Sequence, residues 1–167
     1  MLASVTTFAV YGIDSKPVTV EVDIRERGLP AFTIVGLPDR AVRESRERVR
    51  AALKNSGFDF PSGRITVNLA PADLRKAGPA FDLALAVGIL SASGQIPEGA
   101  TAGCAVCGEA SLTGALRPVR GALAMALGAC TAGIGCLLVP PDMAREAALV
   151  ADAVSYTHLT LPTICSV

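Results

Sequence analysis

Residues 64–90 read RITVNLAPADLRKAGPAFDLALAVGIL, and the order of elements within them decides the fold. Arg64–Leu69 is rich in apolar and β-branched residues and predicts a strand. The loop APADLRKAGP follows, and an apolar helix is expected from about Ala80 to Ser93. A loop that ends in Gly-Pro and leads into a helix often presents a nucleophile. Whether this loop does so decides whether the chain is an enzyme.

The residues before this stretch predict a hairpin, a third strand and a helix. Val5–Tyr11 and Val18–Ile24 are strand-like and flank the turn GIDSKP. The stretch LPAFTIVGLP predicts a short third strand. Asp39 is placed to cap a helix that runs to about Ser56, with Gly57 just beyond its end.

The residues after it predict shorter elements. A strand pair is expected in CAVCGEASLTGALRPV, with its turn at Thr113-Gly114. A helix at about Gly121–Thr131, a strand at Cys136–Val139 and a last helix at about Pro141–Val150 follow. The order βββαβαββαβα indicates an α+β or α/β domain, residues 1–153, with one mixed β-sheet packed with helices, and we assign it to the α+β class.

The tail, residues 154–167, departs from this composition. VSYTHLTLPTICSV has no charged residue and contains the single histidine of the chain. It resembles translated library adapter, so we interpret it as non-native and exclude it from the fold. On that interpretation the natural protein continues past about Ala153. The alternative is a genuine terminal strand, because THLTLPT alternates.

Charge and cysteine content give little sign of a ligand. Lys+Arg and Asp+Glu number 15 each, so the net charge predicts no partner. Cys104 and Cys107 form an isolated C-x-x-C. In a strand, positions three apart point to opposite faces, so these thiols are not expected to share a metal. With His158 as the single histidine, we expect no metal site and no histidine relay.

One uncharged stretch, Gly121–Pro141, is long enough to raise the question of a membrane span. Glycines and Pro140 interrupt it, which favours a buried helix, turn and strand. The N-terminus MLASVTTFAV has no positive charge before its apolar run and does not resemble a signal peptide. We therefore expect a cytoplasmic protein with no membrane partner.

The predicted helix after Asp39 carries a basic stripe on the face opposite its apolar side. At about 100° per residue the stripe consists of Arg43, Arg46, Arg50 and Lys54. The functional hypothesis is contact with DNA phosphates or with an acidic neighbouring subunit. The alternative is a solvated face stabilised by the pairs Arg43–Glu47 and Arg40–Glu44, and charge runs more often have this role.

Three longer segments together resemble one family. They are YGIDSKPVTVEVDIRERGLPAFTIVGLPDRAVRESRERVRAAL, RITVNLAPADLRKAGPAFDLALAVGIL and GEASLTGALRPVRG. They are similar to the N-terminal region of magnesium-chelatase-like AAA+ ATPases of the ComM/YifB type, over about residues 3–150. The resemblance implies a ribosomal-S5-domain-2-like fold, similar to the Lon protease C-terminal domain. It also implies a following ATPase module that uses ATP and Mg, a hexameric ring (a homo-oligomer), and DNA processing by branch migration in natural transformation.

The resemblance also answers the question of the Gly-Pro loop. Lon-type domains use a Ser-Lys dyad, in which a neutral amine takes the proton of the serine hydroxyl. In this chain Ala80 occupies the serine position and Met125 the lysine position. Neither side chain can perform the reaction, and Asp82 has no paired acid or histidine in the sequence. We predict that the chain has no catalytic residue and is not a peptidase.

ATP is not expected to bind to this chain. A Walker A loop needs G-x-x-x-x-G-K-S/T, which does not occur in the sequence. We therefore expect no cofactor in this chain, with ATP and Mg belonging to the missing module. Two alternatives are a stand-alone nucleic-acid-binding module and a Lon-type peptidase. The zero net charge and the lack of exposed aromatic platforms in the sequence pattern weigh against the first, and the missing dyad against the second.

Overall fold

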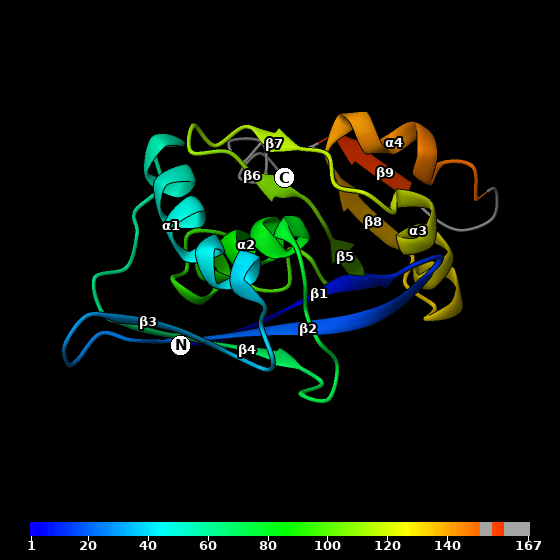
Figure 1. Cartoon of the computed structure of the whole chain (residues 1–167). Helices are drawn as coiled ribbons and strands as arrows, with labels where there is room; N and C mark the ends of the chain where they lie inside the picture. The colour runs from blue at the N-terminus through cyan, green and yellow to red at the C-terminus, as the bar shows by residue number, and fades with distance from the viewer. Residues whose placement is uncertain (151–154, 159–167) are drawn as a thin grey trace.

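The fold is described by a computed structural model that covers residues 1–150 and the backbone of residues 155–158. The strands are β1 (Leu2–Tyr11), β2 (Asp14–Arg25), β3 (Ala31–Val35), β4 (Arg64–Ala70), β5 (Cys104–Val106), β6 (Glu109–Ala110), β7 (Leu116–Arg117), β8 (Cys136–Val139) and β9 (Ser155–His158). The helices are α1 (Arg40–Asn55), α2 (Asp82–Ala92), α3 (Ala122–Thr131) and α4 (Pro141–Ala147), and a 3-10 turn, η1 (Pro79–Phe81), precedes α2. The chain therefore has a mixed α/β architecture (Figure 1).

The main sheet has the strand order β3-β4-β2-β1-β5-β8-β9. Its centre is antiparallel, because β2 pairs with β1 on one side and with β4 on the other. Both flanks are parallel: β3 runs along β4, and β5 runs along β1 and is followed by β8 and β9. Strands β6 and β7 form a separate two-stranded ribbon. The sheet is thus mixed, as the sequence predicted.

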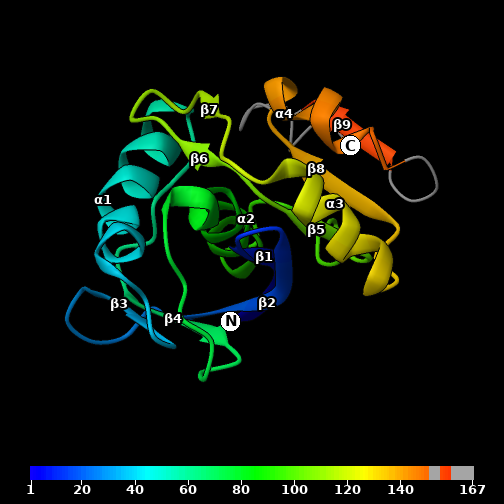
Figure 2. The ribbon, with the colours of Figure 1, turned by 45° about the vertical axis from the view of Figure 1, so that its right-hand side comes forward.

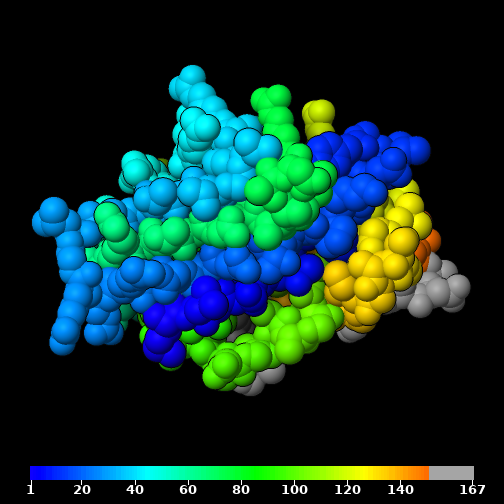
Figure 3. All heavy atoms as spheres, turned by 90° about the horizontal axis from the view of Figure 1, so that it is seen from below, coloured from blue at the N-terminus to red at the C-terminus, as the bar shows by residue number. Residues whose placement is uncertain are grey.

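The larger core lies between strands β1–β4 and helices α1 and α2, which cover one face of the sheet (Figure 1). Alternate residues of β2 are buried there, namely Val18, Val20, Val22 and Ile24. Gly88 lets α2 approach closely, since a Cβ at this position would lie 2.7 Å from Val22 Cγ2. Part of the opposite face, formed by β1, β2 and β4, lies at the surface when the molecule is seen from below (Figure 3).

A smaller core lies beside it, where α3 and α4 pack near β8 (Figure 2). Phe8 from β1 and Met125 from α3 are fully or almost fully buried in it, together with Leu137 and Met143. These elements belong to the uncharged stretch Gly121–Pro141. In the described part of the chain, no helix is long and apolar enough to cross a membrane, which agrees with the helix-turn-strand interpretation.

The predicted turn GIDSKP is shorter than expected, because β1 ends at Tyr11 and β2 already begins at Asp14. The structure corrects three further boundaries. The pair expected in CAVCGEASLTGALRPV is three short strands, because the chain leaves the main sheet after β5. Gly108 N donates to Ala80 O over 3.1 Å, and Gly108 O accepts from Leu83 N over 3.1 Å, which ties the chain to the start of α2. The predicted turn at Thr113-Gly114 does connect β6 to β7.

The other two corrections concern helix ends. The helix expected from Ala80 begins as η1 and becomes α-helical only at Asp82. The last helix ends at Ala147, where Val150 N bonds back three residues to Ala147 O and the chain continues as turns. The predicted non-native tail, residues 154–167, lies outside the described residues except for the backbone of β9.

Candidate functional site

Helix α1 positions the basic residues, and its ends follow the sequence. Asp39 caps it as predicted: Asp39 Oδ1 accepts from Val42 N over 2.8 Å, and Oδ2 accepts from Gly78 N over 3.2 Å. One carboxylate thus fixes the helix start to the Gly-Pro loop. The core-facing side contains the buried residues Val42, Ser45, Val49, Ala52 and Leu53. All four residues of the predicted basic stripe are exposed on the other side.

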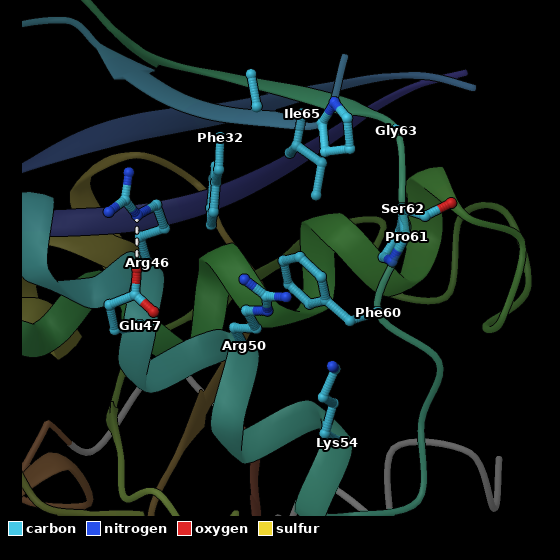
Figure 4. A pocket seen from close by; sticks show the side chains of 12 residues that line it. Phe32, Arg46, Glu47, Arg50, Lys54, Phe60, Pro61, Ser62, Gly63 and Ile65 are labelled. Carbon is cyan, nitrogen blue, oxygen red and sulfur yellow. Dashed lines mark hydrogen bonds and ion pairs between the residues drawn. The ribbon is translucent and has the colours of Figure 1, made fainter. Parts of the chain in front are cut away.

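The structure divides this stripe between two hollows. Arg46, Arg50 and Lys54 line one groove with β3 and the loop before β4 (Figure 4). Arg43 lies in a different hollow, which it shares with Arg40, Arg75 and the tip of the loop between β3 and α1. We call the first of these the α1 groove; its lining is Pro30, Ala31, Phe32, Arg46, Glu47, Arg50, Lys54, Phe60, Pro61, Ser62, Gly63 and Ile65.

The α1 groove has a volume of about 460 Å³ and contains two aromatic rings. The ring centroids of Phe32 and Phe60 are 6.2 Å apart, and their planes are inclined at 49°. Arg50 Cζ lies 5.6 Å from the centroid of Phe60, a cation–π contact. Both phenylalanines are half-buried. The sequence pattern gave no exposed aromatic platform, and the structure places two half-buried rings in the groove; the letters FDFPSG after the helix were the available signal for Phe60.

The ion pairs of α1 leave most of the groove's positive charge unneutralised. Arg46 Nε lies 2.9 Å from Glu47 Oε1, so the predicted pair Arg43–Glu47 is wrong. The predicted pair Arg40–Glu44 is confirmed at 2.8 Å and lies outside the groove. Within residues 1–150, Arg50 and Lys54 form no ion pair.

The two positions that the Lon-type resemblance compares with a Ser-Lys dyad meet in a second hollow of about 410 Å³. Ala80 and Met125 both line it, although they come from η1 and α3. Met125 is 1% exposed, and its thioether has no proton to give and no useful basicity. Ser111 and Thr113 of the turn SLTG hydrogen-bond to each other over 2.8 Å. The hollow thus brings Ala80 and Met125 together, and neither side chain offers a nucleophile or a base.

The buried Lys76 is not a substitute for the missing lysine. Its Nζ donates to the carbonyl of Pro71 in the same loop, and Lys76 does not line the Ala80–Met125 hollow. Burial lowers the pKa of Lys76, and the nearby Asp73 carboxylate opposes this more weakly. Its backbone also bonds to the loop before α1, with Lys76 N donating to Leu37 O over 3.2 Å. We interpret Lys76 as a residue that shapes the loop.

Asp82, which the sequence left without a partner, forms an ion pair with Arg48. Arg48 Nε lies 2.7 Å from Asp82 Oδ2. Ser45 and the backbone N–H of Ala110 also donate to this carboxylate. The hydrogen bond that Arg48 donates to Asp82 raises the pKa of Arg48, although burial opposes this shift. Both carboxylate oxygens of Asp82 thus accept hydrogen bonds within the protein.

The four described cysteines are free thiols, of which Cys107 is buried and Cys130 is exposed. Cys107 lies against Thr7, with Sγ 3.4 Å from Oγ1, and Cys104 is the neighbour of Cys136 across β5 and β8. The thiols of Cys104 and Cys107 thus have different neighbours. Burial raises the pKa of Cys107 to about 11, and burial together with Cys104 raises that of Cys136 to about 11. No group of three or more His, Cys, Asp or Glu side chains converges within residues 1–150.

Comparison with known proteins places this arrangement in a family. The family model described as Subunit ChlI of Mg-chelatase matches residues 20–143. The chain belongs to this magnesium-chelatase ChlI family. The match covers the residues that line the α1 groove and, except for Phe8 and Val10, those that line the Ala80–Met125 hollow.

Relatives in the family are similar along almost the whole chain. YifB of Salmonella typhimurium, an uncharacterized protein, is 44% identical over 165 residues, which is 99% of this chain and 32% of the relative. The competence protein ComM of Haemophilus influenzae is 44% identical over 160 residues, 96% of this chain and 31% of the relative. The chain thus spans about a third of the length of these curated relatives.

Proposed function

We propose that the chain is the N-terminal, non-catalytic domain of a magnesium-chelatase-like AAA+ ATPase and that it holds DNA in the α1 groove. The single observation that carries this proposal is the convergence of Arg46, Arg50 and Lys54 in one groove. In the proposed whole protein, ATP and Mg act in another module of a cytoplasmic hexameric ring, and the DNA is processed during natural transformation.

Charge and exposure support a phosphate-binding role. The three cations are exposed, and two of them have no carboxylate partner within the described chain. Phosphates bound by such side chains release condensed counterions, which supplies most of the affinity for nucleic acids. A solvated helix face would instead pair its charges along the helix, as Arg40 and Glu44 do outside the groove.

The Ala80–Met125 hollow supports a non-catalytic domain. Its two converging positions correspond to the dyad of the Lon-type fold that we propose for this chain, and neither Ala80 nor Met125 can act as nucleophile or base. On this proposal the domain has kept the shape of a peptidase and positions DNA for the motor.

The DNA proposal is tested by neutralising the groove. Arg46→Gln/Arg50→Gln/Lys54→Gln is compared with Lys16→Gln/Arg117→Gln/Arg145→Gln, which removes the same charge from exposed positions elsewhere. Binding of labelled single-stranded and forked DNA is measured at two salt concentrations. We expect the groove variant to bind more weakly, with a salt slope smaller by about 2 on single strands. Equal affinity and slope in both variants would refute the proposal.

A stand-alone nucleic-acid-binding module is the second candidate, and the aromatic rings of the α1 groove favour it. The two candidates differ in the sequence that the natural reading frame encodes beyond Ala153. A long read across the gene that reaches G-x-x-x-x-G-K-S/T supports the ATPase domain, and a stop codon directly after Val167 supports the free-standing module.

A further inference from the structure

We propose that the α1 groove binds a single strand, with an unpaired base stacked on the surface formed by Phe60 and the guanidinium of Arg50. This inference rests on the proposed DNA function and specifies the form of DNA that the groove takes. It is carried by the placement of Arg50 Cζ 5.6 Å from the Phe60 centroid, inside a hollow of about 460 Å³.

The two walls of the groove offer different chemistry. The α1 wall presents Arg46, Arg50 and Lys54 at intervals of four residues, so one cation projects from each turn, about 6 Å apart along the helix. The facing wall presents Phe32 from β3 and Phe60 from the loop before β4. In Figure 4 the side chains of Arg50 and Lys54 project from α1 on the side of Phe60. A row of basic side chains beside aromatic rings is an arrangement that binds single-stranded nucleic acids.

The ring geometry indicates how a base is held. Phe32 and Phe60 are inclined at 49° with centroids 6.2 Å apart, so they contact each other and leave no parallel slot between them. A base therefore stacks from outside on the planar guanidinium of Arg50, which itself lies over the Phe60 ring. Arg46 and Lys54 lie one turn away on either side and contact the phosphates that flank that base.

Duplex DNA fits this groove less well than a single strand. In a duplex the base faces are stacked on each other, so only phosphates and groove edges are available to a protein. The half-buried rings of Phe32 and Phe60 then gain nothing from binding. An acidic peptide would pair with the cations but has no flat aromatic face to match Arg50 and Phe60.

The test compares two probes with the same phosphates. One is labelled oligo(dT), and the other is an abasic oligodeoxynucleotide of equal length and label. The whole chain is titrated with each by fluorescence anisotropy at low salt. We expect wild type to bind oligo(dT) about tenfold more tightly than the abasic probe, because stacking of one base accounts for a factor of this size.

Two variants locate the effect. Phe60→Leu is expected to bring the affinity ratio of the two probes close to one and to leave binding of the abasic probe unchanged. Arg50→Lys keeps the charge but loses the planar group, so it should lower the ratio without changing the salt slope. Phe58→Leu is the matched control, because Phe58 is half-buried against the core and does not line the groove. Thermal melts confirm that each variant is folded.

The outcomes separate this inference from the function on which it rests. If wild type binds both probes equally and the groove-charge variant still weakens both, the α1 groove binds phosphates only and the stacking proposal is wrong. If Phe58→Leu lowers the ratio as much as Phe60→Leu, the effect is structural and the stacking proposal is also wrong. If the groove-charge variant binds like its control, the DNA function itself fails.

Discussion

Arg48 of α1 and Asp82 of α2 form an ion pair beneath the Gly-Pro loop, with Arg48 Nε 2.7 Å from Asp82 Oδ2. Arg48 Nη2 also donates to Asp82 Oδ1 over 3.0 Å. The same carboxylate accepts from Ser45 on α1 and from the backbone of Ala110 on β6. One side chain therefore joins α1, α2 and β6, and this connection holds the helix that carries the basic groove.

Removal of the Asp82 carboxylate is expected to be strongly destabilising. Asp82→Ala leaves the partly buried Arg48 without its partner, so the free energy of unfolding should fall by about 3–5 kcal/mol. The measurement is urea unfolding at neutral pH. Glu44→Ala is the control, because it breaks the exposed pair with Arg40 and should change stability by less than about 1 kcal/mol. Similar small losses in both variants would show that the Asp82 connection is not a structural constraint.

Gly36, between β3 and α1, is expected to tolerate no side chain. Its φ is 96°, and a Cβ there would lie 2.2 Å from the carbonyl oxygen of Leu69, which belongs to β4. Gly36→Ala therefore combines backbone strain with a clash against a strand and should destabilise by roughly 2–5 kcal/mol.

Gly12 provides the control for this prediction. Its φ is 64°, but nothing lies within 4 Å of an added Cβ. Gly12→Ala should introduce backbone strain but no clash, so the free energy of unfolding should fall by only about 1–2 kcal/mol, as thermal or urea unfolding would show. If the two variants are equally stable, the close approach to Leu69 has no energetic consequence.

The elements that depend on local patterns could be predicted from the sequence. The Asp39 cap and the two faces of α1 depend on residues within a few turns of one helix, so their spacing determines them. The C-terminal end of α4 and the path of the chain after β5 could not be predicted in this way. After β5 the chain follows hydrogen bonds between Gly108 and the start of α2, which no local sequence pattern indicates.

Only one wall of the candidate site could be predicted from the sequence. The cations of the α1 groove come from one helix and were predicted, whereas Phe32 and Phe60 come from segments that only the tertiary fold brings to it. The stripe was divided because Arg43 lies a turn nearer the loop that contains Arg75. Arg48 was missed because it lies at the edge of the helix between the two faces, where burial depends on α2.

The Ala80–Met125 hollow gives a prediction about catalysis. The purified chain is expected to hydrolyse neither casein nor a fluorogenic peptide above the buffer blank, and Ala80→Ser alone should not change this, because Met125 cannot accept the proton. Met125→Leu should remain folded, with a loss below about 1.5 kcal/mol, since its volume is similar. Hydrolysis by wild type that responds to a change at Ala80 would contradict the non-catalytic assignment.

Cys107 makes a defined contribution to stability at alkaline pH. Burial raises its pKa to about 11, although hydrogen bonds from Thr7 and the Phe8 backbone oppose the shift. Because the folded state favours the protonated thiol, this contribution is fully present below the ordinary thiol pKa of 9.0 and is lost as the pH rises toward about 11.

Cys107→Ser tests this contribution, because a hydroxyl keeps a hydrogen bond to Thr7 and does not titrate in this range. Between about pH 8 and pH 10, wild type should lose about 1 kcal/mol more unfolding free energy than Cys107→Ser, measured by urea unfolding.

The exposed Cys130 serves as the comparison for solvent accessibility. Iodoacetamide should modify Cys130 in the folded chain while Cys107 stays protected, as peptide mapping would show. Parallel pH profiles of the two proteins would mean that the thiolate of Cys107 is accommodated in the fold, against the burial that the structure shows.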